Sequence, residues 1–340
     1  MKPEKALIAI AATALLWGSW SAFAQQSREQ AQRPRQASAT GQPALNVSSV
    51  TKDQYERWMT ELSNWGRWGK DDERGGLNLI TEDKRKQAAA VAKTGAMVSL
   101  SRDIARQKPA ETAQPRPMNR GGALTNLFLS EAAPGGDGDY LFERQEIEYH
   151  GGTLSHFDAL CHVAYKGRNY NGFVFKDIVT KDGCSKLAVT NAKDGIVTRG
   201  ILMDLPETQV KPEDVAAWEK RTGLRVSSGD ALLLRTRRPG GGTPRVRGGY
   251  DPALMPFLKE RDIALLGADI AQEGGRIPGV SLPMHFFTLV ALGVNLLDNL
   301  ALDELADTAN RLKRWEFLLV IEPLRVQNGA GAAVNPVAVF

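Results

Sequence analysis

Histidine is scarce in this chain and unevenly placed. The 340 residues contain four histidines, and three of them, His150, His156 and His162, lie within one short segment together with Asp158. Imidazole nitrogen and carboxylate oxygen are the donors that borderline divalent metals take in proteins. Glycines flank the cluster, which follows a predicted strand, and loops at strand ends commonly carry functional groups. The clustering therefore predicts a metal site here.

The spacing within the cluster favours a common point. His156 and Asp158 are two residues apart, so extended backbone turns both side chains to one face. His162 follows Asp158 by four residues and returns to that face if the backbone becomes helical after Ala159. Up to three groups are then expected around one position.

Two distant residues are candidates for the same site. His285 lies at the start of a predicted helix, with Pro283 near its first turn. The positive end of a helix dipole favours neutral imidazole, which is the form that binds metal. Asp298 ends the next predicted strand, so a helix and a returning strand are expected to bring it beside His285. Taken alone, each has an ordinary alternative, as a packed histidine or as an Asx-turn or cap residue.

The elements that must position these groups are mixed in type. Helical patterns cover residues 52–62, 81–94, 211–222, 251–260 and 283–292, and strand patterns cover 97–100, 140–149, 201–205, 231–235, 263–267, 294–297 and 317–323. Residues 107–120 are rich in proline and read as irregular. The alternation predicts an α/β or α+β domain with a mixed sheet.

The amino-terminal residues are typical of an exported protein. Lys2 and Lys5 precede an apolar run of about 15 residues, shorter than the ~20 that span a bilayer, and Ala22-Phe-Ala24 offers a cleavage site. We expect a signal peptide over residues 1–24, cut after Ala24, and a periplasmic or secreted protein with no stable membrane span. An uncleaved anchor is the alternative.

The remaining chain divides by composition. Residues 25–50 are rich in Gln, Arg, Ser, Ala and Pro and predict a disordered linker. Residues 51–340 suit one large domain or two closely joined lobes. A net charge of +4 without a basic stripe or motif argues against a nucleic-acid partner. For Cys161 and Cys184 the favoured interpretation is a buried thiol near the site; a disulfide between them is the alternative.

A family resemblance joins these features. His156-Phe-Asp158-Ala-Leu-Cys-His162 resembles the His-x-Asp-Ala-Pro-x-His motif of the cyclase, kynurenine formamidase and isatin hydrolase family. Its longer branch is matched, in order over about residues 55–325, by Trp65-Gly-Arg-Trp-Gly, Arg74-Gly-Gly-Leu-Asn-Leu-Ile, Tyr170-Asn-Gly-Phe, Gly229-Asp-Ala-Leu-Leu-Leu-Arg-Thr and Leu266-Gly-Ala-Asp-Ile. The resemblance implies a swivelling β/β/α domain. It also implies homo-oligomers, often dimers, and hydrolysis of amide, lactam or lactone bonds with one or two divalent metals, Zn or Mn.

The resemblance also implies roles for single residues. His156 and Asp158 match metal ligands, with Asp158 as a bridge, and His162 matches the general acid/base. His285 and Asp298 match the distal ligands. His150 lies six residues before His156, whereas the short family pattern has histidine four before, where Gly152 stands here. Either His150 ligates a metal from this shifted position or the site holds a single metal.

The sequence therefore predicts a metal-dependent hydrolase of a small apolar or aromatic molecule, in which His162 accepts the proton of a metal-activated water. Trp65, Trp68 and Phe157 are candidate pocket walls, with a core position as the alternative. Two rivals stay open. A non-haem iron oxygenase shares the His-x-Asp spelling with a distal histidine, and an exported metal-dependent binding protein requires no catalysis.

Overall fold

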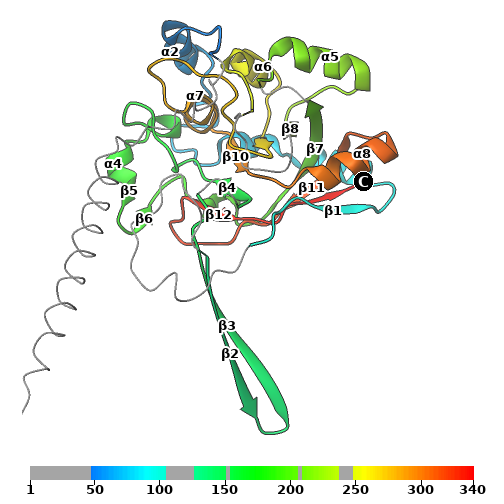
Figure 1. Cartoon of the computed structure of the whole chain (residues 1–340). Helices are drawn as coiled ribbons and strands as arrows, with labels where there is room; N and C mark the ends of the chain where they lie inside the picture. The colour runs from blue at the N-terminus through cyan, green and yellow to red at the C-terminus, as the bar shows by residue number, and fades with distance from the viewer. Residues whose placement is uncertain (1–46, 105–125, 151–153, 206–208, 237–247) are drawn as a thin grey trace, which may run out of the picture. The chain divides into compact units, whose positions relative to one another are not determined.

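One mixed β-sheet forms the centre of the protein. The computed structural model describes residues 47–104, 126–150, 154–205, 209–236 and 248–340. Nine strands lie in the order β1-β13-β11-β7-β8-β9-β10-β4-β12 (Figure 1). Their bounds are β1 Met97–Ser99, β4 His156–Asp158, β7 Ile196–Leu205, β8 Ala231–Thr236, β9 Leu265–Ala268, β10 Asn295–Asp298, β11 Glu316–Ile321, β12 Gly331–Ala333 and β13 Val337–Val339.

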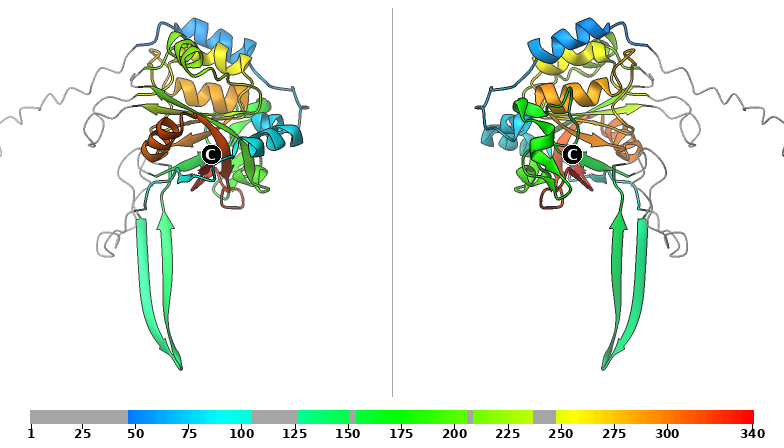
Figure 2. Two further views of the ribbon diagram at one scale, coloured as in Figure 1. Left: turned by 90° about the vertical axis from the view of Figure 1, so that its right-hand side faces the viewer. Right: turned by 90° about the vertical axis from the view of Figure 1, so that its left-hand side faces the viewer.

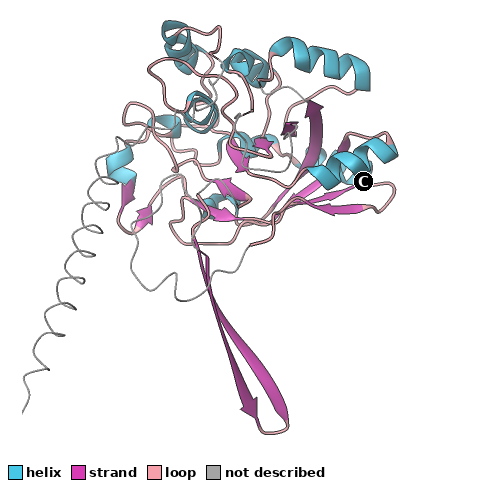
Figure 3. Cartoon of the chain, in the orientation of Figure 1, coloured by secondary structure: helices cyan, strands magenta, loops and turns pink. Residues whose placement is uncertain are grey.

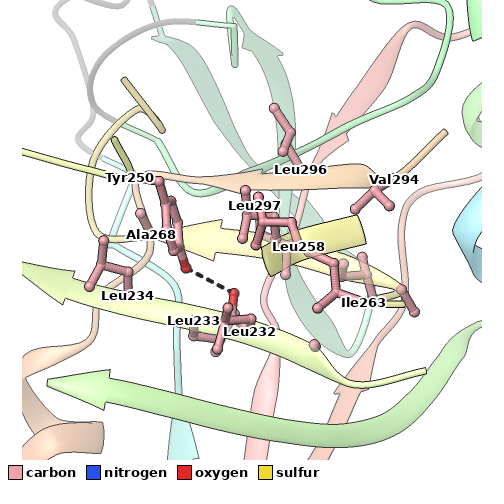
Figure 4. Packing of buried hydrophobic residues seen from close by; sticks show 14 of the residues in the cluster. Leu232, Leu233, Leu234, Tyr250, Leu258, Ile263, Ala268, Val294, Leu296 and Leu297 are labelled. Atoms are coloured by element: carbon pink, nitrogen blue, oxygen red, sulfur yellow. Dashed lines mark hydrogen bonds between the residues drawn. The ribbon is translucent and has the colours of Figure 1, made fainter. Parts of the chain in front are cut away.

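The middle of this sheet is parallel, and most of its residues are buried. Strands β7, β8, β9 and β10 run parallel, whereas β4 and β12 continue the sheet antiparallel beyond β10. Strands covered on both faces read as continuous apolar runs, as Leu232, Leu233 and Leu234 do. Figure 4 shows these leucines packed around Tyr250, whose hydroxyl donates to the carbonyl oxygens of Leu232 at 3.3 Å and Gly267 at 3.0 Å.

Helices pack around the sheet and carry the capping signals of the sequence (Figures 2 and 3). Thr51 and Thr81 cap the first two helices, their hydroxyls accepting backbone N–H groups. Gly293 ends the helix of His285 with φ of 67°. The longer helices are α2 Lys52–Glu61, α3 Glu82–Val91, α5 Pro212–Thr222, α6 Met255–Glu260, α7 Pro283–His285 with its π-helical continuation Phe286–Leu292, and α8 Asp303–Leu312; short ones are Gly75–Leu79, Tyr170–Gly172, α4 Phe175–Ile178, Val189–Ala192 and Pro252–Leu254.

A long hairpin stands apart from the sheet. Strands β2 (Asn126–Gly135) and β3 (Gly138–Ile147) pair antiparallel along their whole length. Figures 1 and 2 show this arm as a separate two-stranded ribbon. The side chains of residues 138–146 are exposed, including Tyr140, Leu141 and Phe142.

Apart from the helical backbone considered after Ala159, the predicted helices and strands that fall on described residues are present, and the mixed α/β fold class is confirmed. After Ala159 the chain makes a turn, with the N–H of His162 donating to Ala159 O at 2.9 Å. The oxygenase alternative is usually found on an all-β jelly roll, and a helix-flanked mixed sheet differs from that fold. The predictions for residues 1–46 and 107–120 lie outside the described residues.

The interpretation of Cys161 as a free thiol is wrong. Cys161 and Cys184 form a disulfide, joining the turn after β4 to the small hairpin of β5 (Val179–Thr180) and β6 (Gly183–Cys184). Their Cα atoms are 6.4 Å apart, within the range that a disulfide spans. Among the described residues, no helix has the length and apolar character needed to cross a membrane.

Candidate metal centre

The register of strands β4 and β10 brings three candidate ligands together, His156, Asp158 and Asp298. Side chains alternate along β4, so His156 and Asp158 share one face and Phe157 takes the other. The antiparallel pairing of β4 with β10 sets Asp298 directly opposite His156. One ligand atom from each of His156, Asp158 and Asp298 lies within 4.8 Å of the others, and all three residues are buried.

Asp158 is the centre of the histidine cluster. Its Oδ1 lies 3.3 Å from His150 Nε2 and 3.6 Å from His156 Nε2, and its Oδ2 lies 3.9 Å from His285 Nε2. The residue is 1% exposed, and neither carboxylate oxygen accepts a hydrogen bond from the described residues. A buried carboxylate in this state is costly unless a cation compensates it. The donor set therefore fits a bound divalent metal.

Two hydrogen bonds fix the histidine tautomers for such a role. His156 Nδ1 donates to Leu154 O at 2.8 Å, and His285 Nδ1 donates to Glu273 Oε1 at 2.8 Å. Each bond leaves Nε2 as the ring nitrogen that faces the carboxylates. A hydrogen bond of this kind on the outer nitrogen is the usual support for a metal-binding histidine.

The surroundings of His285 do not favour neutral imidazole, as the helix dipole was expected to do. Helix α7 has three residues before its π-helical continuation, and the ring lies between Glu273 and Asp298, with Nε2 at 3.4 Å from Asp298 Oδ2. Burial lowers the pKa of His285, but the hydrogen bonds to Asp298 and Glu273 raise it more, to well above the usual value. A metal at this position must therefore displace a proton.

A second group of possible ligands shares Asp158. His150, Asp158 and His162 also place one ligand atom each within 4.8 Å of one another. The rings of His150 and His162 stack, with centroids 4.1 Å apart. Burial lowers the pKa of His162 to about 4 despite the attraction of Asp158, so the ring is neutral at pH 7. Burial alone raises the pKa of Asp158, but the neighbouring histidines, His162 foremost, hold it well below its usual range.

The structure adds supporting residues that the sequence analysis missed. Glu273 also accepts the backbone N–H groups of Met284 at 3.1 Å and His285 at 3.0 Å. Gln272 Nε2 donates to Asp298 Oδ1 at 2.6 Å, and the Tyr149 ring lies 4.3 Å from that of His150. The available signal was the polar pair Gln272-Glu273 shortly after the apolar strand β9.

The three candidate pocket walls lie in different places. Phe157 is buried in the core on the face of β4 opposite Asp158. The Arg67 guanidinium covers the Trp68 ring at 4.7 Å. Trp65 borders an open cavity of about 570 Å³ that Met59 and Tyr165 also line. The ring of Tyr165 lies 5.3 Å from that of Phe286, the residue after His285.

Comparison with known proteins gives a family. The family model described as Cyclase matches residues 86–272, more than half of the chain, and the protein therefore belongs to the cyclase family. The crystal structure of a novel cyclase is similar over 82% of this chain and 100% of its own, at 26% identity and a TM-score of 0.68. The family resemblance and the fold predicted with it are confirmed.

A more distant similarity is to isatin hydrolase A from Ralstonia solanacearum. It covers 74% of this chain and 95% of that protein, at 18% identity and a TM-score of 0.45. An isatin hydrolase bound to the product analogue thioisatinate is similar over 72% of this chain and 92% of its own, at 19% identity and a TM-score of 0.47. No curated protein matches the chain.

Proposed function

We propose that the protein is a metal-dependent hydrolase that cleaves an amide, lactam, lactone or ester bond of a small apolar or aromatic molecule. The observation that carries this proposal is Asp158, a buried carboxylate with no hydrogen bond from the described residues and with three histidine Nε2 atoms between 3.3 and 3.9 Å away. Membership of the cyclase family supports it.

The residues divide into two overlapping ligand sets. His156, Asp158 and Asp298, with His285 beside them, would hold one cation, and His150 with Asp158 would contribute to a second if two were bound. Mixed imidazole and carboxylate donors suit Zn or Mn. When bound, a divalent cation supplies Lewis-acid polarisation of the scissile carbonyl and increases the acidity of nearby water.

His162 is the proposed general acid/base. It is neutral at pH 7, because burial lowers its pKa to about 4, and so it can accept a proton from the attacking water. It then returns that proton to the leaving nitrogen or oxygen. The Trp65 cavity, with Met59 and Tyr165, offers an apolar surface for the body of the substrate.

A substrate panel tests the proposal. Purified protein is loaded with Zn or Mn and offered formamides, isatin-like lactams and lactones, while carboxylate formation is measured. We expect turnover of at least one class, and we expect His162→Ala to keep its metal but lose about 10²- to 10⁴-fold in kcat. If the loaded protein binds panel compounds without cleaving any, the non-catalytic binding protein is supported instead.

We propose further that the protein is exported and cut after Ala24. The disulfide between Cys161 and Cys184 supports this, because disulfides persist mainly in oxidising compartments. Expression of the full chain in a bacterium tests it. The expected product is a periplasmic or secreted form whose mass begins at Gln25, and a full-length protein retained in the cytoplasm would contradict it.

We also propose that the protein forms a homodimer through the β2–β3 arm. The arm exposes Tyr140, Leu141 and Phe142. Exposed aromatic and aliphatic side chains in this number on one strand favour burial against a second copy of the chain.

Light scattering after size exclusion measures the oligomeric state of wild-type and variant proteins. We expect Leu141→Asp to give monomers and Leu324→Asp, at an exposed leucine outside the arm, to leave dimers intact. A wild-type protein that is monomeric at micromolar concentration would contradict the proposed dimer.

A further inference from the structure

The proposed general base, His162, lies in a turn whose backbone carbonyl groups accept hydrogen bonds from the buried side chain of Asn169. His162 lies in the turn of residues 159–163, and three carbonyl oxygens of this turn lie around Asn169 Nδ2. Asn169 Nδ2 is 2.7 Å from Val163 O and 3.4 Å from both Leu160 O and Cys161 O. Three carbonyl acceptors around one amide nitrogen fix the orientation of the amide. The residue is completely buried, so water does not compete for these contacts.

Asn169 is itself held in place by the Tyr170-Asn-Gly-Phe segment. Its backbone N–H donates to Phe173 O at 2.9 Å, and its own carbonyl accepts the N–H of Gly172 at 3.2 Å. The Tyr170 hydroxyl donates to Asp72 Oδ2 at 3.0 Å. The segment thus forms a closed turn anchored to the body of the protein. The Tyr170-Asn-Gly-Phe motif therefore serves to hold Asn169 in place.

The disulfide anchors the same turn one residue before His162. Cys161 is bonded to Cys184, whose backbone N–H donates to Asn328 O at 2.8 Å. The N–H of Cys161 donates to Leu187 O at 3.2 Å. Both cysteines are buried, which makes this a permanent tie and not an exposed redox switch.

These anchors are separate from those of the metal ligands. His156 and Asp158 are fixed by the ladder of β4 with β10 and β12, and Asn295 Nδ2 donates to Asp158 O at 2.9 Å. A loosened turn therefore displaces His162 while leaving the strand that carries the carboxylate in place.

We propose that Asn169, Cys161 and Cys184 are positioning residues. The asparagine amide and the disulfide hold the turn of His162 at the metal site. The inference rests on the role proposed for His162. Small displacements of a catalytic group cost rate steeply, because proton transfer needs close and aligned partners. The turn carries the proposed proton-transfer group, so the loss should fall on kcat more than on KM.

The kinetic test compares variants with matched controls. Asn169→Ala removes the amide donor, and Cys161→Ala with Cys184→Ala removes the tie without leaving a free thiol. Asn171→Gly is the control, because Asn171 lies in the same segment at φ of 60° and bonds Gly66, Gly69 and the Asp72 carbonyl instead of this turn. We expect kcat to fall about 10- to 100-fold in both test variants, with KM and zinc content unchanged, and wild-type kinetics for the control.

Ring spectra give a readout that does not depend on turnover. The chain has four histidines, so the ¹H–¹⁵N ring signals of zinc-loaded protein can be assigned by single substitutions, His162→Ala among them. Asn169→Ala should shift or broaden the signals of His162 and spare those of His156 and His285. The disulfide-free variant should do the same, and it carries the test if Asn169→Ala does not fold.

The kinetic and spectroscopic results distinguish a failure of the positioning role of Asn169 from a failure of the proposed hydrolase activity. Unchanged His162 signals and kcat in a folded variant would overturn the positioning role. Loss of zinc together with activity would also overturn it, because the turn would then support the metal site itself. Shifted His162 signals in a protein that cleaves no substrate would keep the positioning role and refute the hydrolase.

Discussion

Asp158 concentrates the chemistry of the site in one side chain. The Nε2 atoms of His150 and His156 face Asp158 Oδ1, and that of His285 faces Oδ2. None of these contacts is a hydrogen bond, because each is too long or poorly directed. Groups drawn together at 3.3 to 3.9 Å without bonding one another are what a shared cation requires. Metal affinity at this site therefore depends on how firmly the surrounding residues fix the ligands.

Glu273 provides the first prediction. Glu273→Gln keeps the size of the side chain but removes the charge beside His285 Nδ1, so His285 becomes a weaker ligand. We expect metal affinity, measured by competition with a chromogenic chelator, to fall about 10- to 100-fold. Glu260→Gln, at an exposed glutamate on α6, serves as the control. Equal affinities in the two variants would remove the support assigned to Glu273.

The pH dependence of the metal-free protein gives a second prediction. His162 has a lowered folded pKa of about 4, so its contribution to stability is lost as pH falls from about 6.5 toward 4. His285 has a raised folded pKa, so its contribution is present below about 6.5 and is lost as pH rises through the folded value. The two opposite slopes predict a maximum in melting temperature near pH 6.5.

Thermal melts of chelator-treated protein across pH 4–9 check this expectation. His162→Ala should flatten the acid side of the profile, and His285→Ala should flatten the alkaline side. A profile that neither substitution changes would show that these protonation states do not contribute to stability.

At the scale of elements, long periodic segments were predictable and the parts that complete the site were not. Strand β4 has three residues, too few for an alternation to reveal, and its place between β10 and β12 depends on pairings distant in sequence. His162 was expected on a helix but stands on a turn, because Asn169 and the disulfide supply tertiary contacts that override local pattern.

Gly293 provides a prediction about the helix that carries His285. A Cβ atom at this position would lie 2.4 Å from the Tyr170 ring, and φ is +67°. Gly95 has a φ of +74° with nothing within 4 Å, so it isolates the backbone effect. We expect Gly95→Ala to destabilise by about 1 kcal/mol and Gly293→Ala by about 1–3 kcal/mol more, from overpacking.

Urea unfolding monitored by tryptophan fluorescence measures both differences. Equal losses of stability in the two variants would mean that the contact between Gly293 and Tyr170 does not restrict the end of this helix.

For the whole molecule, the sequence predicted the fold class and the family, because several motifs in order specify both. The four histidines and Asp298 were candidates by type and spacing alone, and the structure brings them around Asp158. Glu273 and Gln272 were missed because a supporting carboxylate or amide has no spacing rule of its own. Of the aromatic residues predicted as pocket walls, Trp65 borders the cavity that Met59 and Tyr165 also line, whereas the sequence did not indicate that Phe157 faces the core.

The most direct test of the central claim is a metal titration of stripped protein. Protein freed of metal by a chelator receives stepwise Zn or Mn, and the hydrolysis rate of the best panel substrate is measured at each step. We expect a rate that starts near zero, rises with bound metal and saturates at one or two ions per chain. A folded, metal-free protein with full activity would contradict it.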